Sequence, residues 1–322
     1  MNARKLKGQG FEELVPERDV GKYLRNLVFS SDEEENPFTT LSFEDFVQDI
    51  FSKSYPMHNF NVWHIHYLCA QVDQLLLKPT NRYLTAALPR YHLKSTILGE
   101  AASIYRMLTA YGDGMYISFK DELAMYHLSH IKEAIRINEN LNKYLTDMSP
   151  QSDAIINYRM GSKKMKIFGS GVMAVKRGIH TDTIVVADDI LGDLANPMVL
   201  TEMDKVKRLF NAEIMNIPNA QCPLFVFGTV MDYSDILFTL RKNANFVSIW
   251  LPAINPTIDR DILWPEQFDR KVLDDKKDAT DWRAFSTEFL LTPMLATEAF
   301  FTREQLDTVI NKDLKNFQCP GF

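Results

Sequence analysis

The chain has 322 residues, 46% of them hydrophobic and 24% charged, which is ordinary for a globular protein with room for one large domain or two smaller ones. Its formal net charge of −6 excludes a chain that is basic overall, so nucleic acid could be contacted only through local patches. The three cysteines are far apart and form no metal-binding pair, and no apolar run approaches the ~20 residues of a membrane span. We therefore expect a soluble, intracellular protein.

Apolar runs and helix-like stretches alternate along most of the chain. A helix is expected first, over residues 63–77. The runs expected to form strands are 83–88, 114–118, 183–187, 224–227 and 246–251, and the helices expected between them are 97–108, 122–145 and 201–215. This alternation predicts an α/β fold with a mainly parallel sheet that helices cover on both faces.

Two further regions depart from this alternation. Residues 165–175, with Gly169-Ser170-Gly171 in the middle, are expected to form an inserted hairpin. After about residue 252 the alternation stops, and helices are expected over 266–276 and 281–291. The predicted organisation is an N-terminal lead-in (1–57), a core (58–251) and a small C-terminal lid or linker subdomain (252–322).

The segment 88–96 lies between an expected strand and an expected helix, and it ends in Lys94-Ser95-Thr96. A strand, a tight loop, Lys-Ser/Thr and a helix form the phosphate-binding P-loop, in which backbone N–H groups cradle phosphates, the lysine neutralises charge and the hydroxyl holds Mg²⁺. The consensus has glycine where this chain has Leu88 and Leu93. The alternative is an ordinary strand-to-helix turn with a solvated lysine, so a second element has to decide.

That element is the apolar strand expected at 183–187, which ends in Asp188-Asp189. Ligands of open α/β sheets bind at the carboxyl ends of strands, where one carboxylate could orient hydrated Mg²⁺ and the other could activate water. A third apolar strand ends in Gly228-Thr229, whose hydroxyl could sense the γ-phosphate. Taken alone, acidic pairs also cap helices, and a strand followed by a turn is common.

The order of these motifs resembles the ATPase part of the large terminase subunit of tailed bacteriophages, the DNA-packaging motor. The matching motifs are Pro89-Arg90-Tyr91-His92-Leu93-Lys94-Ser95-Thr96 for Walker A, Ile184 to Asp189 for Walker B, Gly228-Thr229 with Asp235-Ile236-Leu237 for the coupling motif, Trp264-Pro265-Glu266, and Phe285 to Pro293. The resemblance covers roughly residues 58 to 305 and implies an additional-strand, catalytic-acid (RecA-like) P-loop NTPase. Family members usually continue into a nuclease domain, for which this chain is too short, so we expect no nuclease activity.

The resemblance implies a role for each matching residue, with ATP and Mg²⁺ as ligands. Lys94 would bind the β- and γ-phosphates, and Ser95 and Asp188 would hold Mg²⁺. Asp189 would stand in for the usual catalytic glutamate. The remaining implied roles are Arg90 as a cis arginine, Thr229 as the coupling residue, Trp63 and His66 as adenine contacts, and Arg136 or Arg177 as an arginine acting on a neighbouring subunit.

The implied partners are double-stranded DNA, the portal protein and the small terminase subunit, with the chain in a homo-oligomeric ring, a pentamer by resemblance. It would act in the host cytoplasm and transiently at the portal vertex of a procapsid. Lys163-Lys164-Met165-Lys166 and Lys176-Arg177 are basic spots that could contact DNA backbones. Two alternatives stay open: a helicase-like DNA-remodelling ATPase, and a non-catalytic interaction module with a degenerate P-loop.

Overall fold

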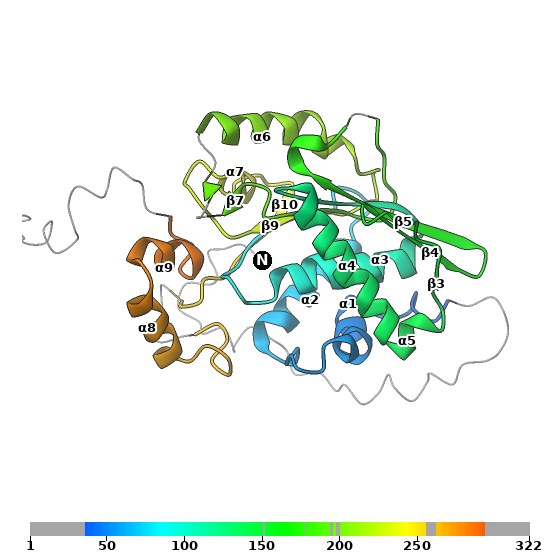
Figure 1. The fold of residues 1–322 in the computed structure, drawn as a ribbon, viewed down its shortest axis with the longest axis horizontal. Helices are drawn as coiled ribbons and strands as arrows, with labels where there is room; N and C mark the ends of the chain where they lie inside the picture. Colours follow the sequence, from blue (N-terminus) through cyan, green and yellow to red (C-terminus); the bar gives the residue numbers. More distant parts are fainter. Residues whose placement is uncertain are drawn as a thin grey trace, which may run out of the picture.

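A computed structural model describes residues 36–150, 152–176, 178–193, 196–197, 200–255 and 262–293. In this described part, eight strands form one sheet in the order β10-β1-β9-β6-β2-β5-β4-β3 (Figure 1). The strands are β1 (Tyr83–Ala87), β2 (Gly112–Ser118), β3 (Thr146–Asp147), β4 (Ile155–Met160), β5 (Lys163–Gly171), β6 (Val185–Asp188), β9 (Leu224–Gly228) and β10 (Phe246–Trp250). All neighbours run parallel except at one edge, where β4 is antiparallel to both β5 and β3. The expected mainly parallel α/β sheet is confirmed. A separate pair, β7 (Gly192–Asp193) and β8 (Asn196–Pro197), is antiparallel.

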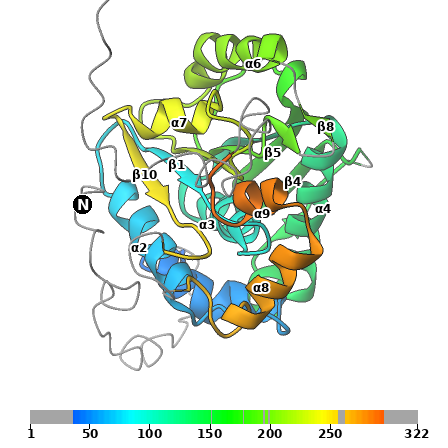
Figure 2. The same cartoon turned by 90° about the vertical axis from the view of Figure 1, so that its left-hand side faces the viewer.

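Helices cover both faces of the sheet. One face carries α1 (Phe43–Asp45), α2 (Trp63–Leu76), α3 (Ala102–Ala110), α4 (Asp121–Ile137) and α5 (Glu139–Asn142), and the other carries α6 (Leu200–Ala212) and α7 (Ile236–Arg241) (Figure 1). Two more helices, α8 (Arg270–Ala279) and α9 (Trp282–Glu288), lie together at one end of the molecule (Figure 2). None of the helices in the described ranges combines the length and the apolar character needed to cross a membrane.

The central strands β6 and β9 are buried at every position, and apart from Asp188 at the end of β6 they carry no polar side chain, because both faces of the sheet are covered. Along β6, Val186 points into the core beneath α2 and α3, whereas Val185 and Ala187 belong to the core beneath α6 and α7. On β9, Phe225 contributes to the first core and Val226 to the second. These alternating side chains fix the register that brings the carboxyl ends of β1, β6 and β9 to one edge of the sheet.

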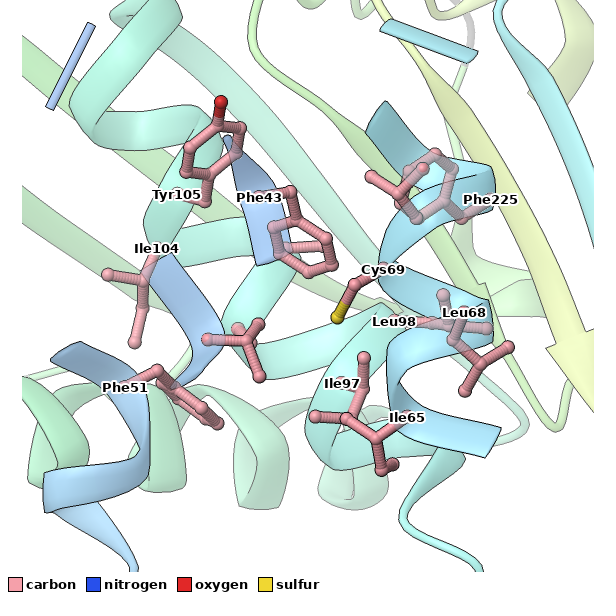
Figure 3. Packing of buried hydrophobic residues seen from close by; sticks show 14 of the residues in the cluster. Phe43, Phe51, Ile65, Leu68, Cys69, Ile97, Leu98, Ile104, Tyr105 and Phe225 are labelled. Atoms are coloured by element: carbon pink, nitrogen blue, oxygen red, sulfur yellow. The ribbon is translucent and has the colours of Figure 1, made fainter. Parts of the chain in front are cut away.

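The described part of the predicted lead-in packs into the first core. Phe43 of α1, which packs on α2, belongs to the same core as Ile65 and Leu68 of α2 (Figure 3). Phe51 also belongs to this core; it starts a 3₁₀ turn (Phe51–Ser54) that follows a π-helical turn (Phe46–Ile50). Residues on both sides of position 57 therefore share one hydrophobic core. The division of the chain at that position stays a prediction.

The predicted hairpin was placed wrongly. The turn is at Gly161-Ser162, between β4 and β5, and Gly169-Ser170-Gly171 lies within β5. These glycines allow α4 to approach the sheet closely instead of turning the chain. A Cβ atom at Gly169 would lie 2.9 Å from a methyl carbon of Leu128, and one at Gly171 would lie 2.9 Å from the backbone nitrogen of Asp121.

Two predicted helices have different bounds. The expected helix over 122–145 is broken at Asn138, whose backbone is extended and whose buried side chain donates to the carbonyl of Ile50 and caps α5 at Asn140. The helix expected from residue 266 begins at Arg270, where Asp269 caps it by accepting from the backbone nitrogen of Val272. The part of the predicted lid at 256–261 and 294–322 lies outside the described residues.

Candidate active site

The loop between β1 and the next helix has two non-glycine residues in a backbone conformation that favours glycine. Tyr91 and Leu93 have φ angles of 65° and 59°, in the left-handed region that favours glycine. Each such residue costs about 1–2 kcal/mol relative to an ordinary conformation. The helix that follows begins at Ser95, winds as a π-helix to Ala101 and continues as α3. The backbone of this loop is therefore strained at two positions that hold no glycine.

Packing from two sides holds this strained loop. The imidazole of His92 is buried and stacks on Phe268, with ring centroids 4.7 Å apart. His64 of α2 and Trp264 complete the cluster, with His64 centred 5.8 Å from His92. Burial lowers the pKa of His64 to about 3 and that of His92 to about 4, so both imidazoles are neutral at physiological pH. On the exposed side, the ammonium of Lys276 lies 5.3 Å from the ring centroid of Tyr91.

Arg90 is directed toward α9. Its backbone nitrogen donates to the carbonyl of Glu288 at 3.0 Å, and its guanidinium lies 2.7 Å from the Glu288 carboxylate. The tip of the loop is thus tied to the C-terminal helices by backbone and side chain together.

Lys94 and Asp189 meet at the carboxyl edge of the sheet. The Lys94 ammonium is largely buried and lies 3.2 Å from a carboxylate oxygen of Asp189, the residue that follows β6. Asp189 has a φ angle of 46°, and its other oxygen accepts from the backbone nitrogen of Thr229 at 2.8 Å. Gly228 leaves room for this carboxylate, because a Cβ atom there would lie 2.6 Å from the same oxygen. The three predicted motifs therefore converge on Asp189.

Asp188, the last residue of β6, is buried behind this point. One of its oxygens accepts from the Tyr116 hydroxyl at 2.8 Å and lies 3.4 Å from Nε2 of His127. Burial and the neighbouring charge of Asp189 raise the pKa of Asp188. Space for the Tyr116 ring comes from Gly99, since a Cβ atom at that position would collide with the tyrosine hydroxyl.

The other ring nitrogen of His127 contacts Glu100, which is buried in the helix that starts at Ser95. Nδ1 of His127 lies 3.2 Å from the Glu100 carboxylate, which also accepts from Tyr55 and contacts His130. Burial would lower the pKa of His127, but the hydrogen bond to Glu100 and the charges of Asp188 and Glu100 outweigh it and raise the pKa. Burial would raise the pKa of Glu100, but hydrogen bonds from His127, His130 and Tyr55 leave it lowered.

The residues fit a magnesium ion held mainly by water and phosphate. The second oxygen of Asp188 is buried without a hydrogen-bond partner among the described residues, which leaves an acceptor for a metal-bound water. In the same ranges, no group of three or more His, Cys, Asp or Glu side chains forms a protein-only metal site. Mg²⁺ typically takes one or two protein ligands together with waters and substrate phosphates.

A small cavity lies between the ends of β6 and β9. Its volume is about 10 Å³, room for about one water molecule, and its lining includes Asp189, Thr229 and Asp235. Asp235 caps α7 by accepting from the backbone nitrogen of Leu237, and burial raises its pKa to about 7. The cavity therefore lies between the end of the predicted Walker B motif and the predicted coupling motif.

Other predicted site residues do not meet at this edge. Trp63 stacks on Tyr67, and the ring nitrogens of His66 contact Glu44 and Asn61. Arg136 is exposed near the end of α4 and pairs with Glu133 of the same helix. Arg177 lies outside the described residues. Their adenine and trans-acting roles stay predictions.

Several residues of the site were missed in the sequence. His127 and Tyr116 contact Asp188, and Glu100 contacts His127. His64 is the member of the 63–67 segment that lies against His92 in the loop after β1. No motif marks them, because three different elements supply the residues around Asp188. The sequence features that could have indicated these residues are two histidines three positions apart in one predicted helix, and a glutamate in the predicted helix that follows Lys94-Ser95-Thr96.

The fold is a mainly parallel α/β sheet, and at one edge of it the loop after β1 that carries Lys94 meets the acidic pair at the end of β6. No family model matches the sequence, and no curated protein matches it.

Solved structures to which the chain is similar include large terminases of bacteriophages. The ATPase domain of the Thermus phage P74-26 large terminase has a TM-score of 0.47 and 11% identity, covering 68% of this chain and 90% of that one. The large terminase of a thermophilic bacteriophage, in complex with ADP, has a TM-score of 0.47 and 8% identity, covering 73% and 56%. The HK97 bacteriophage large terminase has a TM-score of 0.49 and 10% identity, covering 76% and 55%. The ordered motifs of the sequence resemble this same family.

Proposed function

We propose that the chain is an ATPase that hydrolyses Mg·ATP at the edge formed by β1, β6 and β9. The observation that carries the proposal is the convergence of Lys94, Asp189 and Thr229, which come from three separate motifs. A lysine in the loop between a strand and a helix, and a carboxylate at the end of another strand of the same sheet, form the two sides of a nucleotide phosphate site.

In this mechanism the phosphates take the place that Asp189 occupies beside Lys94. The lysine then neutralises charge on the β- and γ-phosphates, and the freed Asp189 orients and deprotonates the attacking water. Ser95 and Asp188 would hold Mg²⁺, which would neutralise phosphate charge when bound. Thr229, bonded to Asp189 through its backbone nitrogen, transmits loss of the γ-phosphate toward α7.

Arg90 is the proposed cis arginine, and it must exchange Glu288 for the γ-phosphate before it can act. Trp63 and His66 are the proposed adenine contacts. Arg136 or Arg177 of a neighbouring subunit is proposed to add a second positive charge in the ring.

We further propose that hydrolysis drives double-stranded DNA into a viral procapsid, in a homo-oligomeric ring with the portal protein and small terminase subunit as partners. The order of the motifs along the sequence supports this role. The exposed Lys163 and Lys164 at the β4–β5 turn offer a local contact for DNA backbones on a chain of net charge −6. The ring would work in the host cytoplasm and at the portal vertex.

Calorimetry with Mg·ATP tests the nucleotide site. The unmodified chain is expected to bind, Lys94→Ala to lose binding, and the matched control Lys271→Ala, on the exposed face of α8, to bind normally. Failure of the unmodified chain to bind, both alone and assembled, would favour the non-catalytic module.

DNA-stimulated turnover tests the motor proposal separately. The variant Lys163→Ala/Lys164→Ala is expected to lower stimulation by double-stranded DNA and to weaken its salt dependence. Stimulation that is unchanged by this variant would remove the hairpin from the DNA interface. Turnover that DNA does not affect at all, measured on the assembled ring, would contradict a packaging motor.

A further inference from the structure

His127 is enclosed between carboxylates from two different elements. Its Nδ1 lies 3.2 Å from Glu100 on the helix that begins at Ser95, and its Nε2 lies 3.4 Å from Asp188 at the end of β6. We propose that His127 is a positioning residue that ties the P-loop helix to Walker B and so sets the geometry of the magnesium site. This inference rests on the proposed nucleotide site and names a residue that no motif marks.

The bridge joins the two elements whose spacing the metal requires. Ser95 starts the helix that carries Glu100, and Asp188 ends the strand on the opposite side of the site. Mg²⁺ demands near-ideal octahedral geometry, so a small change in the separation of its two protein contacts lowers its affinity. A histidine that contacts both elements restrains that separation from a third one, α4.

The same contact also orients the Asp188 carboxylate. His127 and the Tyr116 hydroxyl both approach one oxygen of Asp188, and the other oxygen is left without a hydrogen-bond partner among the described residues. The two contacts therefore assign one oxygen to the protein and leave the other for the water shell of the metal. Partners of this kind around a metal site typically affect metal affinity by about 10–100-fold.

The neighbouring His130 supplies a matched control. Its Nδ1 lies 3.3 Å from the same oxygen of Glu100, but no contact joins it to Asp188, and 39% of its side chain is exposed. The two histidines share a helix, a residue type and a partner. Only His127 makes the second contact, which carries the proposal.

The experiment measures binding of a non-hydrolysable ATP analogue by calorimetry, with Mg²⁺ and with a chelator, and takes the ratio of the two affinities. We expect His127→Ala to lower this ratio by about tenfold, with little change in the chelator arm. His127→Gln, whose amide can still donate to Asp188, should recover most of the ratio, and His130→Ala should match the unmodified chain.

Tyr116→Phe keeps the inference testable if His127→Ala does not fold. This variant removes the hydroxyl that donates to the Asp188 oxygen contacted by His127. It should therefore also lower the ratio of the affinities with and without Mg²⁺. An unchanged ratio in a folded His127→Ala variant would overturn the inference. If His127→Ala does not fold, an unchanged ratio in Tyr116→Phe would overturn it. An equally large fall of the ratio in His130→Ala would also overturn it. If the unmodified chain bound the analogue in neither arm, the proposed function would fail together with it. Binding with an unchanged ratio overturns this inference alone.

Discussion

The ammonium of Lys94 lies 3.2 Å from the carboxylate of Asp189, so the proposed phosphate-binding lysine and the proposed base neutralise each other. Nucleotide has to separate this pair, because the lysine cannot hold the phosphates while its charge is engaged by the carboxylate. Binding of the phosphates would therefore release the base at the same time as it positions the group to be attacked.

Asp189→Asn should separate binding from hydrolysis. The amide cannot take a proton from water, so turnover should fall by about 10²–10⁴-fold. Affinity for Mg·ATP should stay equal or rise, since Lys94 loses its competing anion. Phosphate release and calorimetry measure the two effects. Asp278→Asn, at an exposed carboxylate of α8, is the control, and normal turnover in Asp189→Asn would refute the assigned role.

The left-handed backbone at Tyr91 predicts that glycine is more stabilising than alanine at this position, the reverse of the order at an ordinary position. Because φ is 65° there, Tyr91→Gly should be more stable than Tyr91→Ala by about 1 kcal/mol. Thr280, exposed and with a φ of −122°, is the control position, where the alanine variant should equal or exceed the glycine variant. Denaturant unfolding compares the four proteins. A more stable alanine variant at position 91 would contradict the strained loop.

Gly228→Ala should disturb Asp189 without removing any functional group. The added methyl would lie 2.6 Å from the carboxylate oxygen that accepts from Thr229, so the carboxylate must move. We expect turnover to fall by at least about tenfold, because a displaced carboxylate no longer positions the attacking water. The affinity for Mg·ATP should change much less. Gly161→Ala, where a Cβ atom meets nothing within 4 Å, is a control for turnover. Full activity in Gly228→Ala would show that Asp189 does not need its present position.

The buried histidines at the P-loop predict a loss of stability in mild acid. Folding lowers the pKa of His64 to about 3 and of His92 to about 4, from the ordinary value of 6.5. Below pH 6.5 the unfolded chain takes up protons that the folded chain refuses, so the free energy of unfolding falls as the pH drops from about 6.5 toward 4. At pH 5 the loss should be about 2 kcal/mol for each histidine.

Denaturant unfolding of His64→Phe at pH 7 and pH 5 measures this effect. The variant should show a fall between the two pH values that is smaller than that of the unmodified chain by about 2 kcal/mol. His58→Phe, at an exposed histidine, should leave the fall unchanged. An identical pH dependence in all three proteins would mean that His64 is protonated in the folded chain.

The sequence by itself determined five of the eight strands of the described sheet and the positions of the principal motifs. Apolar runs identified β1, β6 and β9, and the residues after them placed Lys94, Asp189 and Thr229 at one edge of the sheet. These features are local: a buried parallel strand needs apolar side chains on both faces, and parallel strands end together.

The tertiary structure decided what depends on contacts between distant segments. Gly169 looked like part of a turn, but it lies in a strand because α4 packs closely on it. Tyr91 and Leu93 take a glycine-like backbone that their own preferences oppose, with the loop held by packing around His92. The contact of His127 with both Glu100 and Asp188 exists only where α4, the P-loop helix and β6 meet, and periodicity carries no information about such a meeting.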